Sequence, residues 1–178
     1  MFEDRSDAGR KLADRLAALD LSDPVVYALP RGGVPVAIRI AERLHAPLDL
    51  LFVGRSGAGQ AARRESAELE RRRIRYRGAR QPVPATGRIS LVVDDGVATG
   101  ATMRKALAEL RSQGAALAVV AVPVAPARVI AELREVADRV VVLESPEDVW
   151  AIGPFYTDFH QLSDDETVDL LREFWAGA

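Results

Sequence analysis

A chain of 178 residues, of which 48% are apolar, has the size and composition to fold around one core, so wholesale disorder is excluded. The formal net charge is -2 and there is no cysteine, which excludes disulfides and thiolate metal sites and leaves no overall charge for nucleic acid or a membrane surface. The N-terminus is charged and no apolar stretch reaches the roughly 20 residues that span a bilayer, so we expect a soluble cytoplasmic protein without a membrane or nucleic acid partner.

Helices and strands are predicted to alternate through the first third of the chain. Apolar residues at helical spacing predict a helix over Ser6–Leu19, and a second helix is expected over Val34–Leu44. Short, wholly apolar runs predict buried strands over Val25–Leu29 and Leu48–Val53. The first strand leads into a Pro-Arg-Gly-Gly sequence, which predicts a tight loop.

The segment 54–88 differs from its surroundings because loops at both ends flank a strongly basic helix, predicted over Glu65–Tyr76. Two interpretations of its arginines are open. They supply positive charge to an anion or a partner, or they form a solvated face on which glutamates at helical spacing offset them. We favour the solvated face.

The remaining elements keep the same alternation. They are expected as strands over Ile89–Val93, Ala116–Val122 and Arg139–Leu143 and as helices over Thr102–Gln113, Ala127–Val136 and Ser163–Trp175. Five apolar strands separated by helices predict an α/β fold in which a mostly parallel sheet is covered on both faces. In the doubly wound order 2-1-3-4-5 the first and third strands are neighbours, and ligands bind beyond their carboxyl ends.

Two adjacent carboxylates, Asp94 and Asp95, end the third strand. A loop and the start of a helix follow, made of Gly96, Val97, Ala98, Thr99, Gly100, Ala101 and Thr102. Small residues let backbone N–H groups approach an anion, and a helix N-terminus adds unpaired donors and a positive dipole end. Because carboxylates repel a phosphate beside them, the pattern suits a ligand with hydroxyls or a cation at one end and a phosphate at the other. Ribose 5-phosphate has this polarity, whereas an ordinary strand–loop–helix connection explains neither the paired acids nor the paired glycines and threonines.

The segment 91–103 resembles the motif with which type I phosphoribosyltransferases bind 5-phosphoribosyl-1-pyrophosphate (PRPP). The resemblance implies a three-layer α/β/α fold and Mg²⁺-dependent transfer of a phosphoribosyl group to a nitrogenous base, with release of pyrophosphate. It also implies that Asp94 and Asp95 act in catalysis and contact the ribose hydroxyls and, directly or through them, Mg²⁺, while Val97–Thr102 holds the 5-phosphate. Members of this family often form dimers, so a homodimer is among the expectations.

The loop after the first strand lies where the family binds pyrophosphate. Arg31 offers a forked cationic donor, and Gly32 and Gly33 allow a close approach of the backbone. The resemblance makes all three substrate-binding residues and Arg31 a catalytic one. A plain strand–helix turn is the alternative.

A bacterial subgroup of predicted phosphoribosyltransferases is similar over nearly the whole chain except its middle. The shared segments are 2–5, 28–37, 46–49, 68–72 and 121–126. After the second strand, family members usually carry a lysine-bearing loop that closes over the substrate. Here Arg55 would replace the lysine as a pyrophosphate contact, in a shorter connection. A missing lid favours the alternative of a non-catalytic regulatory protein that binds PRPP or a nucleotide.

We expect a single domain, 1–178, with a core of about 20–143. The last part of the chain, 144–178, is expected to form a hood over the base. In purine phosphoribosyltransferases an aromatic side chain at a similar position stacks on the base, so the resemblance makes Phe155 or Tyr156 base-binding. The other interpretation is that these rings pack the final helix.

Overall fold

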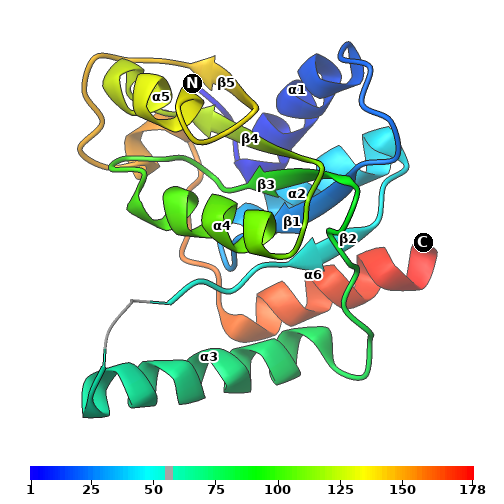
Figure 1. The fold of residues 1–178 in the computed structure, drawn as a ribbon. Helices are drawn as coiled ribbons and strands as arrows, with labels where there is room; N and C mark the ends of the chain where they lie inside the picture. Colours follow the sequence, from blue (N-terminus) through cyan, green and yellow to red (C-terminus); the bar gives the residue numbers. More distant parts are fainter. Residues whose placement is uncertain (55–57) are drawn as a thin grey trace.

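Five parallel strands form one sheet in the order β2-β1-β3-β4-β5 in the computed structural model, which describes residues 1–54 and 58–178 (Figure 1). The strands are β1 (Val25–Ala28), β2 (Leu48–Leu50), β3 (Ile89–Val93), β4 (Leu117–Val124) and β5 (Arg139–Glu144). This order confirms the predicted fold class. It also makes the carboxyl ends of β1 and β3 neighbours, with Ala28 paired to Val93.

Helices cover both faces of the sheet. On one face lie α1 (Arg5–Ala17), α2 (Gly33–Leu44) and α6 (Asp164–Gly177), and on the other lie α4 (Ala101–Ser112) and α5 (Ala127–Arg134). Side chains alternate along β1: Val26 and Ala28 join the first core, and Val25 and Tyr27 join the second. Because both faces are covered, every residue of β1 is buried, which is why the strand is a continuous apolar run.

The second strand is shorter than predicted. The sequence predicts a strand over Leu48–Val53, whereas β2 ends at Leu50. β2 lies at the edge of the sheet beside β1, and Leu51 N donates to Ala28 O at 3.0 Å where their pairing ends. β1 turns there into the loop that begins with Pro30, so the rest of the apolar run has no strand to pair with.

The basic helix, α3 (Gln60–Arg77), lies beside α6 and apart from the sheet (Figure 1). It begins before the predicted Glu65, and Tyr76 is its one buried residue. Neither α3 nor any other helix in the described part of the chain is long and apolar enough to cross a membrane.

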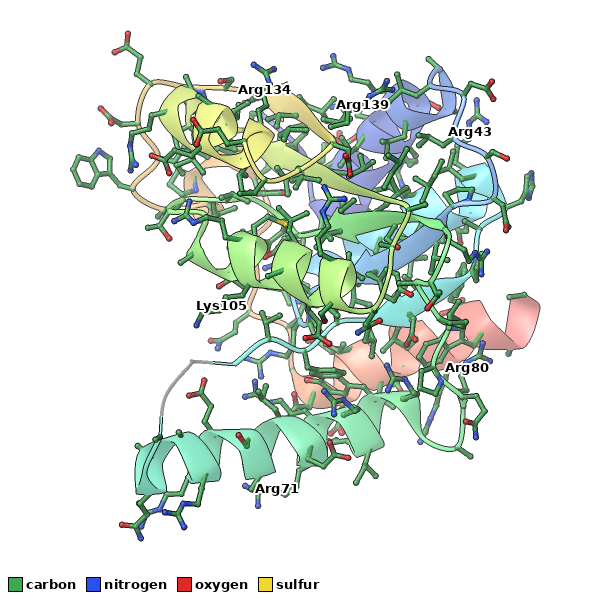
Figure 2. The ribbon with its side chains drawn as sticks, in the orientation of Figure 1. Arg43, Arg71, Arg80, Lys105, Arg134 and Arg139 are labelled. Carbon is green, nitrogen blue, oxygen red and sulfur yellow. The ribbon has the colours of Figure 1, made fainter. Side chains whose placement is uncertain are left out.

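The arginines of α3 form ion pairs within the helix, with α6 and with the sheet. Arg71 pairs with Glu68 within the helix and points away from the rest of the molecule (Figure 2). Such exposed pairs agree with the predicted solvated face. Arg77 differs, because its Nη2 lies 3.0 Å from Oδ1 of the buried Asp49 in β2. The helix is therefore tied to the sheet at its C-terminal end.

The hood is built from both ends of the chain. Phe2 and Tyr156 form a parallel bridge, and they are buried together with Ala8. Phe2 N donates to Phe155 O at 2.9 Å, and Thr157 N donates to Phe2 O at 2.8 Å. The predicted hood held C-terminal residues alone. The N-terminal segment was missed because its pairing joins opposite ends of the sequence.

Candidate functional site

Two loops meet at the carboxyl ends of β1 and β3, as the strand order predicts. A Cβ on Gly33 would lie 2.5 Å from Val93 O, and a Cβ on Gly32 would lie 2.1 Å from Asp95 Oδ2. A larger residue at Gly33 would meet the backbone at the end of β3 and push the two loops apart, whereas one at Gly32 would displace the Asp95 carboxylate. Both glycines are therefore required by the close approach of the β1–α2 loop to the end of β3.

A cavity of about 410 Å³ opens beside these loops. Its lining residues are Arg5, Arg31, Gly32, Asp94, Asp95, Phe159, Gln161 and Leu162. Arg31, Gly32 and the two aspartates are candidates from the sequence, and the structure brings them together. The other lining residues come from the start of α1 and from the hood.

The two carboxylates at the end of β3 have different surroundings. Asp95 N donates to Asp94 Oδ1 at 2.8 Å. Burial, followed by the negative charge of Asp95, raises the pKa of Asp94 well above its ordinary value. Asp95 instead faces a cation, because Arg5 Nε donates to its Oδ2 at 2.9 Å. Only the Asp95 carboxylate of this pair is therefore known to have a cationic partner, Arg5, among the described residues.

Arg5 is a site residue that the sequence reasoning missed. It is the first residue of α1, directly after the capping residue Asp4, and it is 8% exposed. A cation at the N-terminus of a helix is unfavourable for the helix dipole. That mismatch between residue and position is the signal in the sequence that could have found it.

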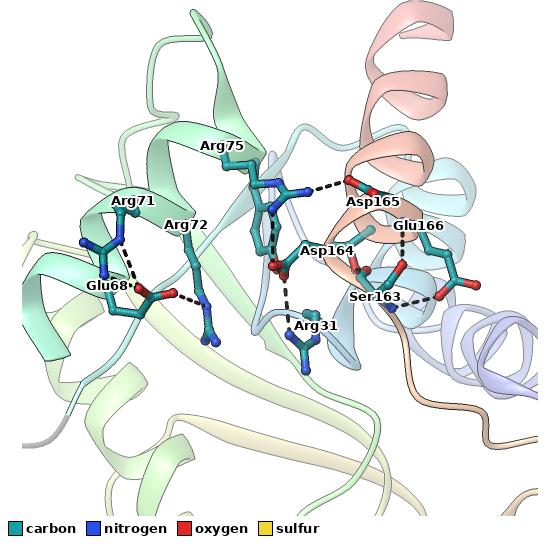
Figure 3. A network of polar contacts seen from close by, with 11 residues as sticks. Arg31, Glu68, Arg71, Arg72, Arg75, Ser163, Asp164, Asp165 and Glu166 are labelled. Carbon is teal, nitrogen blue, oxygen red and sulfur yellow. Dashed lines mark hydrogen bonds and ion pairs between the residues drawn. The ribbon is translucent and has the colours of Figure 1, made fainter.

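Arg31 lies between the cavity and the start of α6. Its Nη1 donates to Asp164 Oδ1 at 3.4 Å, and the peptide bond that joins it to Pro30 is cis. Asp164 also accepts a hydrogen bond from the Tyr76 hydroxyl and pairs with Arg75 at 3.5 Å, so α3 and α6 meet here (Figure 3). The hydrogen bond from Tyr76, together with the bond and charge of Arg31, lowers the pKa of Asp164. Arg31 is thus held by a carboxylate where the sequence predicts an anionic ligand.

The loop predicted to hold a phosphate has an anchored part and an open part. Val97 N donates to Val124 O at 2.9 Å, so β4 engages the amide that we expected to be open to a phosphate. A Cβ on Gly96 would lie 2.7 Å from Ile152, which fixes the loop under the hood. Gly100, with φ 82°, is the N-cap of α4. The open part consists of Thr99, Ala101 and Thr102, which are exposed, and Ala98, which is half-buried.

The hood places Phe159 on the cavity rather than the two rings predicted to bind a base. Tyr156 is 5% exposed, and its ring centroid lies 5.5 Å from that of Phe2 and 5.0 Å from that of Phe159. Its hydroxyl donates to Asp95 O at 2.7 Å. The structure therefore gives Tyr156 a supporting position under the acidic pair, with no face open to a base. Phe155 is half-buried against the same cluster.

The pyrophosphate contact expected of Arg55 lies outside the described residues. The segment before it, 51–54, ends between α3 and α4. A Cβ on Gly54 would lie 2.7 Å from Leu69 of α3, and Lys105 of α4 donates to Gly54 O at 3.0 Å (Figure 2). Both helices therefore pack against the end of this segment.

The acidic pair fits a metal that arrives with its ligand. In the part of the chain that the structure describes, no group of three or more His, Cys, Asp or Glu side chains could hold a metal ion. Mg²⁺ is usually bound by one or two carboxylates together with substrate phosphates and water, instead of by an all-protein cage. Asp94 and Asp95 supply that number of carboxylates at one point of the cavity.

Residues 4–160, which include both site loops, match the family model described as the phosphoribosyl transferase domain. The chain belongs to this family. Its recognition from the motifs at the ends of β1 and β3 is thereby confirmed.

Relatives and solved structures agree with this assignment. A Mycobacterium tuberculosis protein named "Putative phosphoribosyl transferase Rv0571c" is 40% identical over 205 residues, covering 96% of this chain and 46% of the relative. The chain thus spans about half the length of the curated relatives it matches. The crystal structure of TT1426 from Thermus thermophilus has a TM-score of 0.84 at 38% identity and covers 97% of this chain and 98% of that one. Orotate phosphoribosyltransferase from Aeropyrum pernix has a TM-score of 0.54 at 25% identity, covering 77% and 69%.

Proposed function

We propose that this chain is a Mg²⁺-dependent phosphoribosyltransferase that moves a phosphoribosyl group from PRPP to a nitrogenous base. The observation that carries the proposal is a single cavity lined by Arg31 and Gly32 after β1 and by the acidic pair 94–95 after β3, in a member of the phosphoribosyl transferase family. In the reaction the bond from ribose C1 to pyrophosphate breaks, and its electron pair leaves with pyrophosphate. A bond from C1 to a base nitrogen forms, and that nitrogen loses its proton to solvent.

The β3–α4 loop suits the ribose 5-phosphate part of PRPP. The exposed hydroxyls of Thr99 and Thr102, with the backbone amides at the start of α4, are donors for the 5-phosphate. Asp94 and Asp95 lie beside this loop and accept hydrogen bonds from the ribose hydroxyls. As the bond to pyrophosphate breaks, positive charge develops on the ribose ring, and the carboxylates stabilise it.

The β1–α2 loop suits the leaving pyrophosphate. The planar guanidinium of Arg31 can donate to two phosphate oxygens at once, and the backbone of Gly32 lies beside it. To do so, Arg31 exchanges its partner Asp164, at 3.4 Å, for the ligand. Arg55 is proposed as a second cation for the same group. Mg²⁺, when bound with pyrophosphate, neutralises part of the charge on the leaving group.

The hood side of the cavity suits the acceptor base. Tyr156 stacks on Phe159 and Arg5 lies over the same ring, so protein side chains occupy the faces of Phe159. Gln161 and Leu162 line the cavity next to it. We therefore place the base against these two residues, which offer an amide for its polar edge and an apolar contact. A cytoplasmic location and a homodimer complete the proposal, by analogy with the family.

The second candidate is a regulatory protein that binds PRPP or a nucleotide without turnover. Two observations favour it. Arg31 is paired with a carboxylate of the protein itself. The helix α3 lies between β2 and β3, where catalytic relatives carry the loop that closes over the substrate.

Calorimetric titration with PRPP, with and without Mg²⁺, followed by a screen for pyrophosphate release across purine and pyrimidine bases, tests the proposal. We expect Mg²⁺-dependent binding and release of pyrophosphate with one base. Binding without release for any base would favour the regulatory protein. Absence of PRPP binding would remove the transferase and would leave the regulatory protein only as a binder of a nucleotide.

A further inference from the structure

Arg5 is buried where the acidic pair meets the hood. Its Nε donates to Asp95 Oδ2 and its Nη1 donates to His160 O, each at 2.9 Å. Its Cζ lies 3.9 Å from the centroid of the Phe159 ring. These contacts join α1, the β3–α4 loop and the hood at one side chain.

The position of Arg5 is unfavourable for a cation unless an anionic partner offsets the cost of burying the charge. Arginine is rarely buried this far, because removing a charge from water costs free energy that only good partners offset. At the N-terminus of α1 the charge also opposes the helix dipole. An apolar side chain would pack α1 against the hood without either penalty. The charge of Arg5 is therefore better explained by Asp95 than by packing.

Asp95 is fixed from several directions. Arg5 holds its Oδ2, and the same oxygen lies 2.1 Å from where a Cβ of Gly32 would be, so the carboxylate rests on the backbone of the β1–α2 loop. The hydroxyl of Tyr156 holds its carbonyl oxygen at 2.7 Å. A carboxylate held in this way loses little further freedom when it binds a ligand.

We propose that Arg5 is a positioning residue of the ribose site. It holds the Asp95 carboxylate in place for the ribose hydroxyls and links it to Phe159 on the acceptor side of the cavity. The inference rests on the proposed function, because it assigns Arg5 to the ribose part of PRPP. It gives Arg5 no contact with pyrophosphate, which we assign to Arg31 on the other loop.

A lysine cannot reproduce this arrangement. The planar guanidinium lies over Phe159 while separate N–H groups reach Asp95 and His160. An ammonium group keeps the charge beside Asp95 but loses the planar stack and the fork of donors. Arg5→Lys therefore separates charge from geometry, and Arg5→Met removes the charge at similar length.

Binding of three ligands tests the inference. PRPP, ribose 5-phosphate and pyrophosphate are titrated into the wild type, Arg5→Met and Arg5→Lys, with Arg10→Met as a control because Arg10 is exposed on the same helix. Arg5→Met should weaken the affinity for PRPP and for ribose 5-phosphate by about tenfold or more, as expected for a lost charged hydrogen bond. The affinity for pyrophosphate should change by less than about twofold. Arg5→Lys should fall between, and Arg10→Met should match the wild type.

A double-mutant cycle shows whether Arg5 acts through Asp95. Arg5→Met is combined with Asp95→Asn, and the affinity for PRPP is compared with that of each single variant. If Arg5 acts by holding the carboxylate, most of its effect should disappear in the Asp95→Asn background.

The outcomes separate this inference from the proposed function. Equal weakening of all three ligands, or an undiminished effect in the Asp95→Asn background, would overturn the positioning role. PRPP affinity unchanged in Arg5→Met would overturn it while leaving the proposed function intact. A wild type that binds neither PRPP nor ribose 5-phosphate would overturn both. If thermal unfolding shows that Arg5→Met does not fold, Arg5→Lys decides: selective loss of ribose 5-phosphate supports the role, and wild-type affinity contradicts it.

Discussion

Asp94 and Asp95 are adjacent in sequence, yet their side chains have different surroundings. Arg5 neutralises Asp95, whereas burial and the charge of Asp95 raise the pKa of Asp94. A carboxyl group with a raised folded-state pKa favours its neutral form, so a negative charge on Asp94 opposes folding. A group that weakens the fold in this way is better explained by a ligand than by stability.

The Asp94→Asn variant tests this conflict between stability and binding. The amide removes the charge and can still accept the hydrogen bond from Asp95 N. We expect the free energy of unfolding in urea at neutral pH to rise by about 0.5–2 kcal/mol, while calorimetry shows weaker PRPP binding. Asp148→Asn is the control, because Asp148 is exposed in the hood. Lower stability, or wild-type affinity for PRPP, would contradict the argument.

Arg31 distinguishes the two ends of PRPP. Arg31 is assigned to pyrophosphate, so Arg31→Ala should weaken the affinity for PRPP by about tenfold or more, the effect of losing one charged hydrogen bond. The affinity for ribose 5-phosphate should fall much less. Titration of both ligands into this variant and into Arg128→Ala, which removes an exposed arginine of α5, checks the result. Equal losses for both ligands would argue against a pyrophosphate contact.

The residues that line the cavity differ in how far the sequence reveals them. Asp94 comes immediately after β3, and Arg31 and Gly32 lie in the loop after β1. Because the strand order brings these two strand ends together, the local sequence pattern was sufficient to predict that the three residues meet. Arg5 and Phe159 reach the cavity only through the pairing of the N-terminal segment with the hood. Nothing in the local spacing of either residue predicts that pairing.

At the scale of elements, a buried ion pair ties α3 to the edge strand β2. Asp49 is 3% exposed, and its Oδ1 accepts from Arg77 Nε and Nη2 at 3.1 and 3.0 Å. Its Oδ2 accepts from Val83 N at 2.7 Å. A carboxylate this buried is tolerated only with several partners, and removing it leaves Arg77 without its counter-charge.

Asp49→Asn should therefore lower the free energy of unfolding by about 3 kcal/mol, within the range for breaking one partner of a buried pair. Urea denaturation measures this change. Glu70→Gln is the matched control on the same helix, since Glu70 and Arg73 form an exposed pair and should contribute less than about 1 kcal/mol. Similar losses in both variants would mean that the burial of the Asp49 pair does not matter.

The junction of α3, α6 and the β1–α2 loop depends on the charge of Asp164. Its folded-state pKa lies below the ordinary value of 3.8. A lowered folded-state pKa stabilises the fold above the unfolded-state value, and this contribution is lost as pH falls through the folded-state pKa. The wild type should thus lose more unfolding free energy than Asp164→Asn between about pH 6 and about pH 2. Asp169→Asn, at an exposed position of α6, should follow the wild type; parallel curves for all three proteins would exclude the role of Asp164.

The type and order of the elements were predictable because apolar runs and helical spacing are local properties of the chain. The residues at which the elements begin and end were less predictable. β2 stops at Leu50 because its neighbour β1 stops, and α3 starts at Gln60, where no strong cap or apolar period marks a boundary. Both ends depend on the surroundings, which the local pattern does not contain.

At the scale of the whole molecule, the hood depends on the first residues of the chain. Phe2 is 3% exposed, pairs with Tyr156 and contributes a ring to the small core that also holds Ala8. Tyr156 in turn bonds to Asp95 O, and Arg5 follows Phe2 closely in the chain. The N-terminal segment therefore supports the acidic pair through the hood, although it lies far from the phosphate loop in sequence.

Phe2→Ala should loosen this support without unfolding the sheet. The hood core shares few side chains with the two larger cores, so the loss should appear as local opening. We expect faster hydrogen exchange at the amides of 155–158, unchanged exchange in β3, and weaker PRPP binding, because Asp95 is no longer held firmly. Trp150→Ala removes a larger ring from the same hood, but that ring is 93% exposed, so exchange and affinity should stay at wild-type values. If Phe2→Ala instead speeds exchange in β3 as much as in the hood, the hood and the sheet open together, and the N-terminal segment supports the whole fold rather than the site.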